Sequence, residues 1–154
     1  MIYTNSTLKS YLTQDYEKDI DFVEAYDYIN DLFYGLMAAN GNIEEISVYV
    51  TNNTIPTDGT FIKYLYDETF TPDWIRALDT SYGNVVYSEI TYNALGERIF
   101  TMARIMNFGS LNYPYGVLTL SIKEDFIYSM IRQESQEKEI YILNEKGNIL
   151  SAKN

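Results

Sequence analysis

The stretches RIFTMARIM, residues 98–106, and GVLTLSI, residues 116–122, decide the fold of this chain. Both are rich in β-branched and other large apolar residues, which favour strands. In the first stretch both alternating sets of positions are apolar, so we expect that strand to be covered on both faces. A further β-rich run at 85–92 is joined to it by NALGE, which has the length and the glycine of a hairpin loop. The centre of the molecule is therefore predicted to be an antiparallel sheet.

Segments on either side add strands and helices to this sheet. The sequence ISVYV, residues 46–50, predicts a first strand, and PDWIRAL, residues 72–78, predicts a short helix with proline at its first position. A helix is expected over 123–132. The sequence EKG then marks a closing hairpin between 139–144 and 148–151. The predicted class is α+β, with a mainly antiparallel sheet core over residues 43–152 and short covering helices.

The N-terminal part has a helical rather than a strand-like period. Its apolar residues recur in steps of three or four, at Leu8, Leu12, Tyr16, Ile20, Val23, Tyr26, Ile29, Phe33 and Leu36. This spacing predicts one long amphipathic helix over 5–40, packed on the sheet and capped by Asn5 or Ser6. A repeat near 3.5 residues also suits a two-stranded seam, so we expect a parallel homodimer through this helix.

Composition excludes several classes of function. The 154 residues include neither Cys nor His, which removes disulfides, thiolate nucleophiles, imidazole bases and the usual ligands of zinc, copper and haem. The net charge of -11 argues against binding nucleic acid. We predict no catalytic residues, no metal and no cofactor. No apolar run approaches the roughly 18 residues of a membrane span, so the chain as given is expected to be a soluble single domain over 1–154.

Five stretches, in order, carry a resemblance to a known family: ISVYVTNNTIPTDG, PDWIRAL, ERIFTMARIM, YGVLTLSIKEDFI and EIYILNEKGNILSA. Over residues 8–152 they resemble the extracellular Cache (PAS-like) sensor domain of Gram-positive bacterial two-component sensor histidine kinases. The resemblance implies an ectodomain at the outer face of the cell membrane, whose membrane-anchored parent continues into the kinase. It implies that occupancy by a small ligand is transmitted through the N-terminal helix. This fragment, without histidine, is then not an enzyme.

The resemblance also places the ligand between the sheet and the loop and helix that precede its central strands. On this chain that region offers Tyr64, Tyr66, Trp74, Tyr87, Arg104, Tyr113 and Tyr115. Aromatic faces with a few polar groups suit a sugar or a heterocycle. Arg104 can hold the carboxylate of an organic acid through two hydrogen bonds. We therefore predict a chamber enclosed by Arg104, Trp74 and the neighbouring rings.

Amino-acid binding fits less well. The amino-acid-binding members of the family carry an acid near the end of the Gly-Val-Leu strand, where this chain has Leu120, Ser121 and Ile122. Asp125 comes too late in the sequence to take that place.

Several alternatives stay open. Trp74 also fits a core residue, and Arg104 can instead pair with an acid of the protein, such as Asp67, Asp73 or Glu89. The alternative to a sensor is a structural or dimerisation module that binds no small ligand. A carboxylate-based hydrolase is the remaining class, with candidate acids such as Asp73, Asp79 and Glu89. It would need two carboxyl groups about 5 to 10 Å apart in a cleft.

Overall fold

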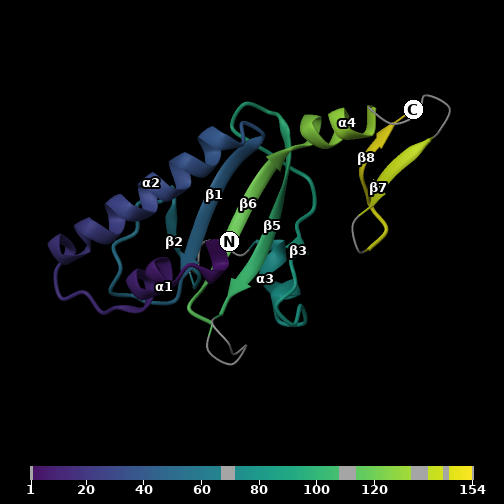
Figure 1. The fold of residues 1–154 in the computed structure, drawn as a ribbon. Coiled ribbons are helices and arrows are strands. Elements are labelled where there is room, and N and C mark those ends of the chain that lie inside the picture. Colours follow the sequence, from purple (N-terminus) through teal and green to yellow (C-terminus); the bar gives the residue numbers. More distant parts are fainter. Residues whose placement is uncertain (1, 67–71, 108–113, 133–138, 144–145, 154) are drawn as a thin grey trace.

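The fold is built on one mixed sheet, seen in a computed structural model that describes residues 2–66, 72–107, 114–132, 139–143 and 146–153 (Figure 1). The sheet has the order β2-β1-β6-β5-β3, with β4 also paired to β5. Its strands are β1 (Ile43–Val50), β2 (Ile62–Tyr64), β3 (Val86–Tyr87), β4 (Thr91–Tyr92), β5 (Arg98–Met106) and β6 (Gly116–Lys123). All the pairings are antiparallel except β1 with β2. The α+β class and the mainly antiparallel sheet are confirmed.

The N-terminal segment is not one continuous helix, and that prediction was wrong. The structure has α1 (Ser6–Thr13), a 3₁₀ turn at Asp19–Phe22 and α2 (Val23–Ala39). Asn5 caps α1 as expected, its side chain accepting from the Leu8 N–H at 2.9 Å. The helix stops because the loop after β1 binds the backbone that follows it. Asn52 Nδ2 donates to the Gln14 carbonyl at 2.7 Å, and the Tyr16 N–H donates to Thr54 Oγ1 at 3.1 Å.

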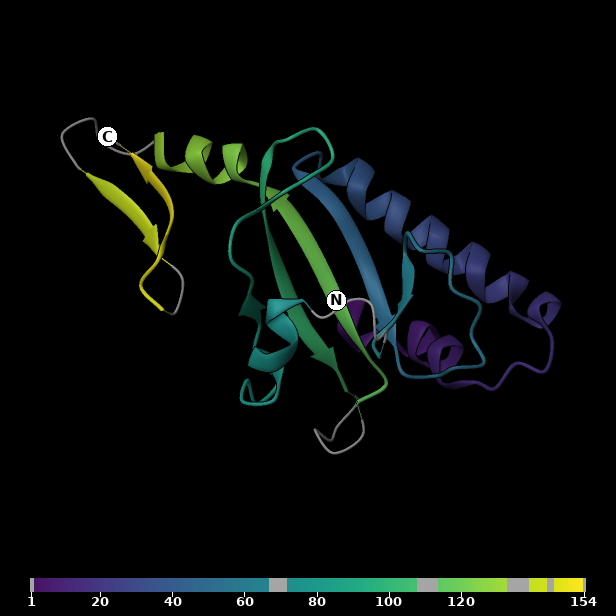
Figure 2. The same cartoon turned by 180° about the vertical axis from the view of Figure 1, so that it is seen from behind.

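The two faces of the sheet carry different layers, because neighbouring residues of a strand point to opposite sides. Val48 and Val50 of β1 pack with α1 and α2 in the largest apolar cluster. Tyr49, between them, packs instead with Trp74 of α3 (Asp73–Leu78). The helices α1 and α2 thus cover one face, which we call the helix face, and α3 lies on the other, which we call the α3 face (Figure 2).

Most of the apolar stripe of the N-terminal segment is buried within the chain, and Ile20 and Val23 are its exposed members. Leu8 and Leu12 of α1, and Ala25, Ile29 and Phe33 of α2, are all buried in the helix-face cluster. The acids of α2 that lie between them, such as Asp27 and Asp31, are exposed. Most of the stripe that predicted a dimer seam therefore packs against the protein's own sheet. The parallel homodimer remains a prediction.

In Figure 1 the C-terminal part lies to the right of the central strands, and α2 lies to their left. Here α4 (Glu124–Arg132) continues from β6, and β7 (Ile140–Leu143) and β8 (Ile149–Lys153) form a separate two-stranded antiparallel sheet. Ile140 and Ile142 pack with Phe100 of β5 in a third apolar cluster. Among the described residues, none of these helices combines the length and the apolar content needed to cross a membrane.

Candidate functional site

The site begins where the predicted strand at 85–92 is interrupted. Instead of one strand, β3 and β4 are separated by residues 88–90. Ser88 keeps one backbone hydrogen bond to β5, because its N–H donates to the Thr101 carbonyl at 2.8 Å. The Thr101 N–H, however, donates to the Ser88 side-chain Oγ at 2.9 Å. A side chain therefore replaces one backbone acceptor of the ladder, and the chain departs from β5 at this point.

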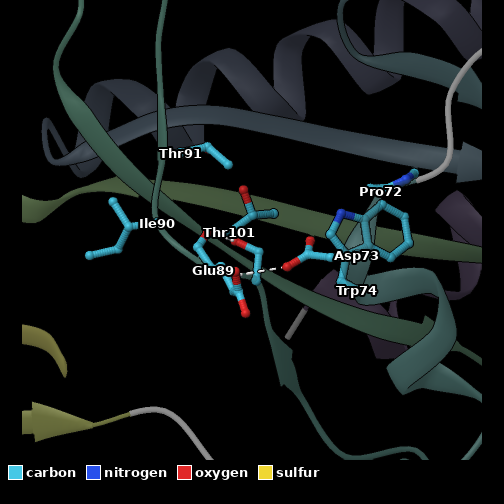
Figure 3. Close-up of a pocket in the computed structure, with 8 residues that line it drawn as sticks. Pro72, Asp73, Trp74, Glu89, Ile90, Thr91 and Thr101 are labelled. Carbon is cyan, nitrogen blue, oxygen red and sulfur yellow. Dashed lines mark hydrogen bonds between the residues drawn. The ribbon is translucent and has the colours of Figure 1, made fainter. Parts of the chain in front are cut away.

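A pocket of about 460 Å³ opens at this interruption, on the α3 face (Figure 3). The start of α3 forms one wall, the segment between β3 and β4 forms the other, and β5 contributes Thr101. The residues that line it are Pro72, Asp73, Trp74, Ser88, Glu89, Ile90, Thr91 and Thr101. A hydrogen bond connects the two walls, because Asp73 Oδ2 accepts from the Glu89 N–H at 2.8 Å. We call this cavity the α3 pocket.

The α3 pocket combines an apolar lining from Pro72, Trp74 and Ile90 with polar side chains that are mainly acceptors. Ser88 Oγ donates to the Glu89 carbonyl at 2.8 Å, so its hydrogen is already used. Thr101 Oγ1 and Ser121 Oγ share one hydrogen bond of 2.7 Å. The two carboxylates, Asp73 and Glu89, add further acceptors, and none of the eight described lining residues is Lys or Arg. The pocket therefore favours ligands that donate hydrogen bonds and disfavours anions.

Trp74 fits both interpretations that the sequence left open. Its side chain is only 4% exposed and packs edge-on against Tyr49, with ring centroids 5.1 Å apart. It also lines the α3 pocket. Burial, and secondarily the charge of Glu45, raises the pKa of Tyr49 to about 12. Trp74 is thus a core residue that presents part of its ring to the pocket.

Arg104 does not join Trp74, and the prediction of one chamber enclosed by both was wrong. In the β5–β6 register Arg104 lies opposite Leu118, whereas its neighbour Ala103 lies opposite Thr119. Directly paired residues share a face of the sheet. Leu118 packs with the helix-face cluster and Ala103 packs with Trp74, so Arg104 and Trp74 lie on opposite faces. Sequence reasoning missed this because both sets of β5 positions are apolar, which hides the side each residue takes.

The predicted tyrosines are also distributed over separate places. Tyr64 and Tyr66 line a different pocket, of about 430 Å³, and the Tyr64 hydroxyl donates to the Ile55 carbonyl at 2.6 Å. Tyr87 pairs with Met102, so it points away from the face that carries Trp74. Tyr115 is buried in the helix-face cluster, and burial raises its pKa. Tyr113 lies outside the described residues. Among the described residues of the predicted set, Trp74 is the one that lines the α3 pocket.

Five polar residues of this pocket were absent from the predicted set: Asp73, Ser88, Glu89, Thr91 and Thr101. The sequence indicated Asp73 and Glu89 only as possible ion-pair partners of Arg104 or as candidate acids of a hydrolase. A hydrolase finds little support in their surroundings. The Glu89 side chain is 62% exposed, Asp73 is exposed and accepts a backbone N–H, and Asp79 does not line the pocket. The described acids also form no group of three that could hold a metal ion.

The comparisons with known proteins bear on the fold. No protein-family model matches the sequence, and the search of curated proteins gives no match. Among solved structures, the chain is similar to the ligand-binding domain of the Campylobacter jejuni chemoreceptor Tlp3, solved in complex with L-valine. The TM-score is 0.51 at 14% sequence identity, and the match covers 98% of this chain and 61% of that one. The chain therefore has the fold of a chemoreceptor ligand-binding domain and spans about three fifths of that neighbour's length.

Proposed function

We propose that this chain is a ligand-sensing domain of the Cache type, with the α3 pocket as its binding site. The observation that carries the proposal is the pocket itself: it joins α3, the interrupted β3–β4 segment and β5, and one hydrogen bond from Asp73 links its walls. Its volume of about 460 Å³ lies in the range of small-molecule sites. The similarity to a chemoreceptor ligand-binding domain supports a sensory role.

The proposed cellular location and parent protein rest on the sequence motifs. Their resemblance to Cache domains supports an extracellular location, in a membrane-anchored parent whose output is a histidine kinase. The fragment itself then senses, and the kinase reaction belongs to other parts of the parent.

The lining distinguishes between the two ligand classes expected from the sequence. An organic acid would bring a third negative charge beside Asp73 and Glu89, and Arg104, the residue expected to clamp it, lies on the other face. A sugar can donate its hydroxyls to the two carboxylates. The Tlp3 domain was solved with L-valine, but the carboxylate of an amino acid would find no cation among the described lining residues here. The lining therefore favours a ligand without negative charge.

Strand β1 offers a route from the pocket to the N-terminal helices. Tyr49 contacts Trp74 at the pocket, while the adjacent Val48 and Val50 pack with α1 and α2 on the other face. A ligand that shifts Trp74 would shift β1, and through it the helices that lead toward the membrane. The ligand can change this equilibrium only by binding one arrangement more tightly than the other.

Ligand screening by thermal shift tests the proposal. The library should contain sugars, amines, amino acids and organic acids, and hits should be repeated on Asp73→Asn and Asp79→Asn. Asp79 is a matched control, since it ends the same helix but does not line the pocket. We expect a specific shift in the wild type and in Asp79→Asn that is lost in Asp73→Asn. Silence across the library, or shifts that are equal in all three proteins, would favour the structural or dimerisation module.

A further inference from the structure

We propose that the loop after β1 forms a second binding site, which takes a neutral oligosaccharide. Two adjoining cavities of about 430 and 510 Å³ lie at this loop, and Thr51 and Asn53 line both of them. Tyr64 and Tyr66 complete the first cavity, and Tyr115 lies in the lining of the second. We call the pair the loop cavities. They share no described lining residue with the α3 pocket, so this inference goes beyond the proposed function and does not depend on it.

The second loop cavity contains a buried polar group that lacks a partner. Tyr115 is only 6% exposed, and its hydroxyl makes no hydrogen bond to any residue that the structure describes. Buried polar groups in proteins are nearly always paired, and an unpaired one costs about 1–3 kcal/mol. A phenol hydroxyl can both donate and accept. A hydroxyl of a bound sugar, directly or through one water, would supply the missing hydrogen bond.

The first loop cavity presents two tyrosine rings. Tyr66 is 82% exposed and Tyr64 is 38% exposed. The Tyr64 hydroxyl donates to the Ile55 carbonyl at 2.6 Å, which holds that ring in place. Leu65, between the two tyrosines, packs instead with the Trp74 cluster. Exposed aromatic rings offer flat apolar faces on which the C–H groups of a sugar ring can pack while its hydroxyls stay hydrated.

The polar groups of the loop cavities favour a ligand without charge. Thr51 and Asn53 are exposed, and their hydroxyl and amide groups both donate and accept hydrogen bonds. Asp15 is the one charged residue in the described lining, although the whole chain has a net charge of -11. Hydroxyls and amides beside aromatic rings suit a molecule that carries many hydroxyls and no ionic group. Because the two cavities adjoin, we expect several linked sugar rings to bind more tightly than one.

Isothermal titration calorimetry with neutral tetrasaccharides tests the inference. The probes are cellotetraose, maltotetraose, xylotetraose and tetra-N-acetylchitotetraose, each compared with its own monosaccharide. We expect at least one tetrasaccharide to bind at least about tenfold more tightly than its monosaccharide, a difference of about 1.4 kcal/mol. Tyr66→Ala should weaken that binding about tenfold, because it removes an exposed ring. Tyr92→Ala is the matched control, since Tyr92 is also largely exposed but lies on β4, outside the lining of the loop cavities, and its removal should leave binding unchanged.

Tyr115→Phe separates ligand binding from packing, because it removes only the hydroxyl oxygen. It should leave the free energy of unfolding in urea unchanged or higher, and it should weaken tetrasaccharide binding a few-fold. Affinity equal to that of the wild type in Tyr66→Ala or in Tyr115→Phe would overturn the inference. Binding that is lost in Asp73→Asn and kept in Tyr66→Ala would place the sugar in the α3 pocket, so this inference would fail while the proposed function stands. Silence from all four tetrasaccharides would overturn the inference as well.

Discussion

Asn52 should hold the bend between α1 and α2, and its replacement should destabilise the whole fold. Its amide nitrogen donates to the Gln14 carbonyl at 2.7 Å, at the end of α1. Its Oδ1 accepts from the Thr54 N–H at 3.0 Å and from the Thr54 hydroxyl at 2.7 Å, and Thr54 in turn accepts from Tyr16. One side chain thereby joins the N-terminal segment to the loop after β1. The perturbation is Asn52→Ala.

The expected magnitude follows from these contacts. Asn52→Ala removes three well-formed hydrogen bonds, each worth about 0.5–1.5 kcal/mol net. Asn52 is only half-buried, so water can replace part of them, and we expect a loss of about 2 kcal/mol. For a chain of this size that corresponds to a fall of about 4–8 °C in Tm. Asn52→Asp keeps the acceptor for Thr54 and loses one of the three hydrogen bonds, the donor to Gln14, so its effect should be smaller than that of Asn52→Ala.

Urea unfolding followed by circular dichroism measures these free energies, and an unchanged slope against urea would show that the comparison is valid. Asn53→Ala is the matched control, because Asn53 is the adjacent asparagine and its side chain is exposed. Equal urea midpoints for Asn52→Ala and Asn53→Ala would show that the Asn52 side chain does not stabilise the bend.

Two further predictions concern the sheet. Gly116→Ala should destabilise the fold by about 1–3 kcal/mol in urea unfolding, because the added Cβ would lie 2.7 Å from the backbone oxygen of Tyr49. Gly35→Ala is the control, since a Cβ added there meets open space, and it should be neutral or stabilising. Equal effects of the two substitutions on stability would contradict the prediction. Burial keeps Tyr49 neutral in the folded protein, so its contribution to stability should be complete below the ordinary pKa of 10.0 and lost as the pH rises toward about 12. Tyr49→Phe should therefore lose less stability than the wild type across that window, and identical pH profiles would rule this out.

The central strands were predictable because nearly all residues in two long runs favour the β conformation. Residues 98–106 and 116–122 correspond to β5 and β6, and both faces of β5 are covered as expected. The break after α1 was hidden because apolar spacing continues through Tyr16 and Ile20, while the hydrogen bonds that end the helix come from Asn52 and Thr54. Periodicity reports which side of a helix is apolar, and it does not report a distant side chain that binds the backbone.

The pocket was less predictable than the sheet. Residues 85–92 have the composition of one strand, and nothing local reveals that the Ser88 hydroxyl replaces a backbone acceptor of β5. The short strand β2 was missed for a related reason, since three residues are too few to show alternation and its partner β1 is parallel. Arg104 was selected as a charged residue within an apolar run. Its face depends on the register with β6, which the sequence alone does not provide.

The bend at residues 14–22 changes what the N-terminal segment can do mechanically. A continuous rod would carry a push along its axis from one end to the other. Here the chain turns at Gln14, and Asn52 and Thr54 fasten that turn to the loop that leaves β1. A load applied to α1 therefore reaches the end of β1 through this joint as well as passing along the chain to α2.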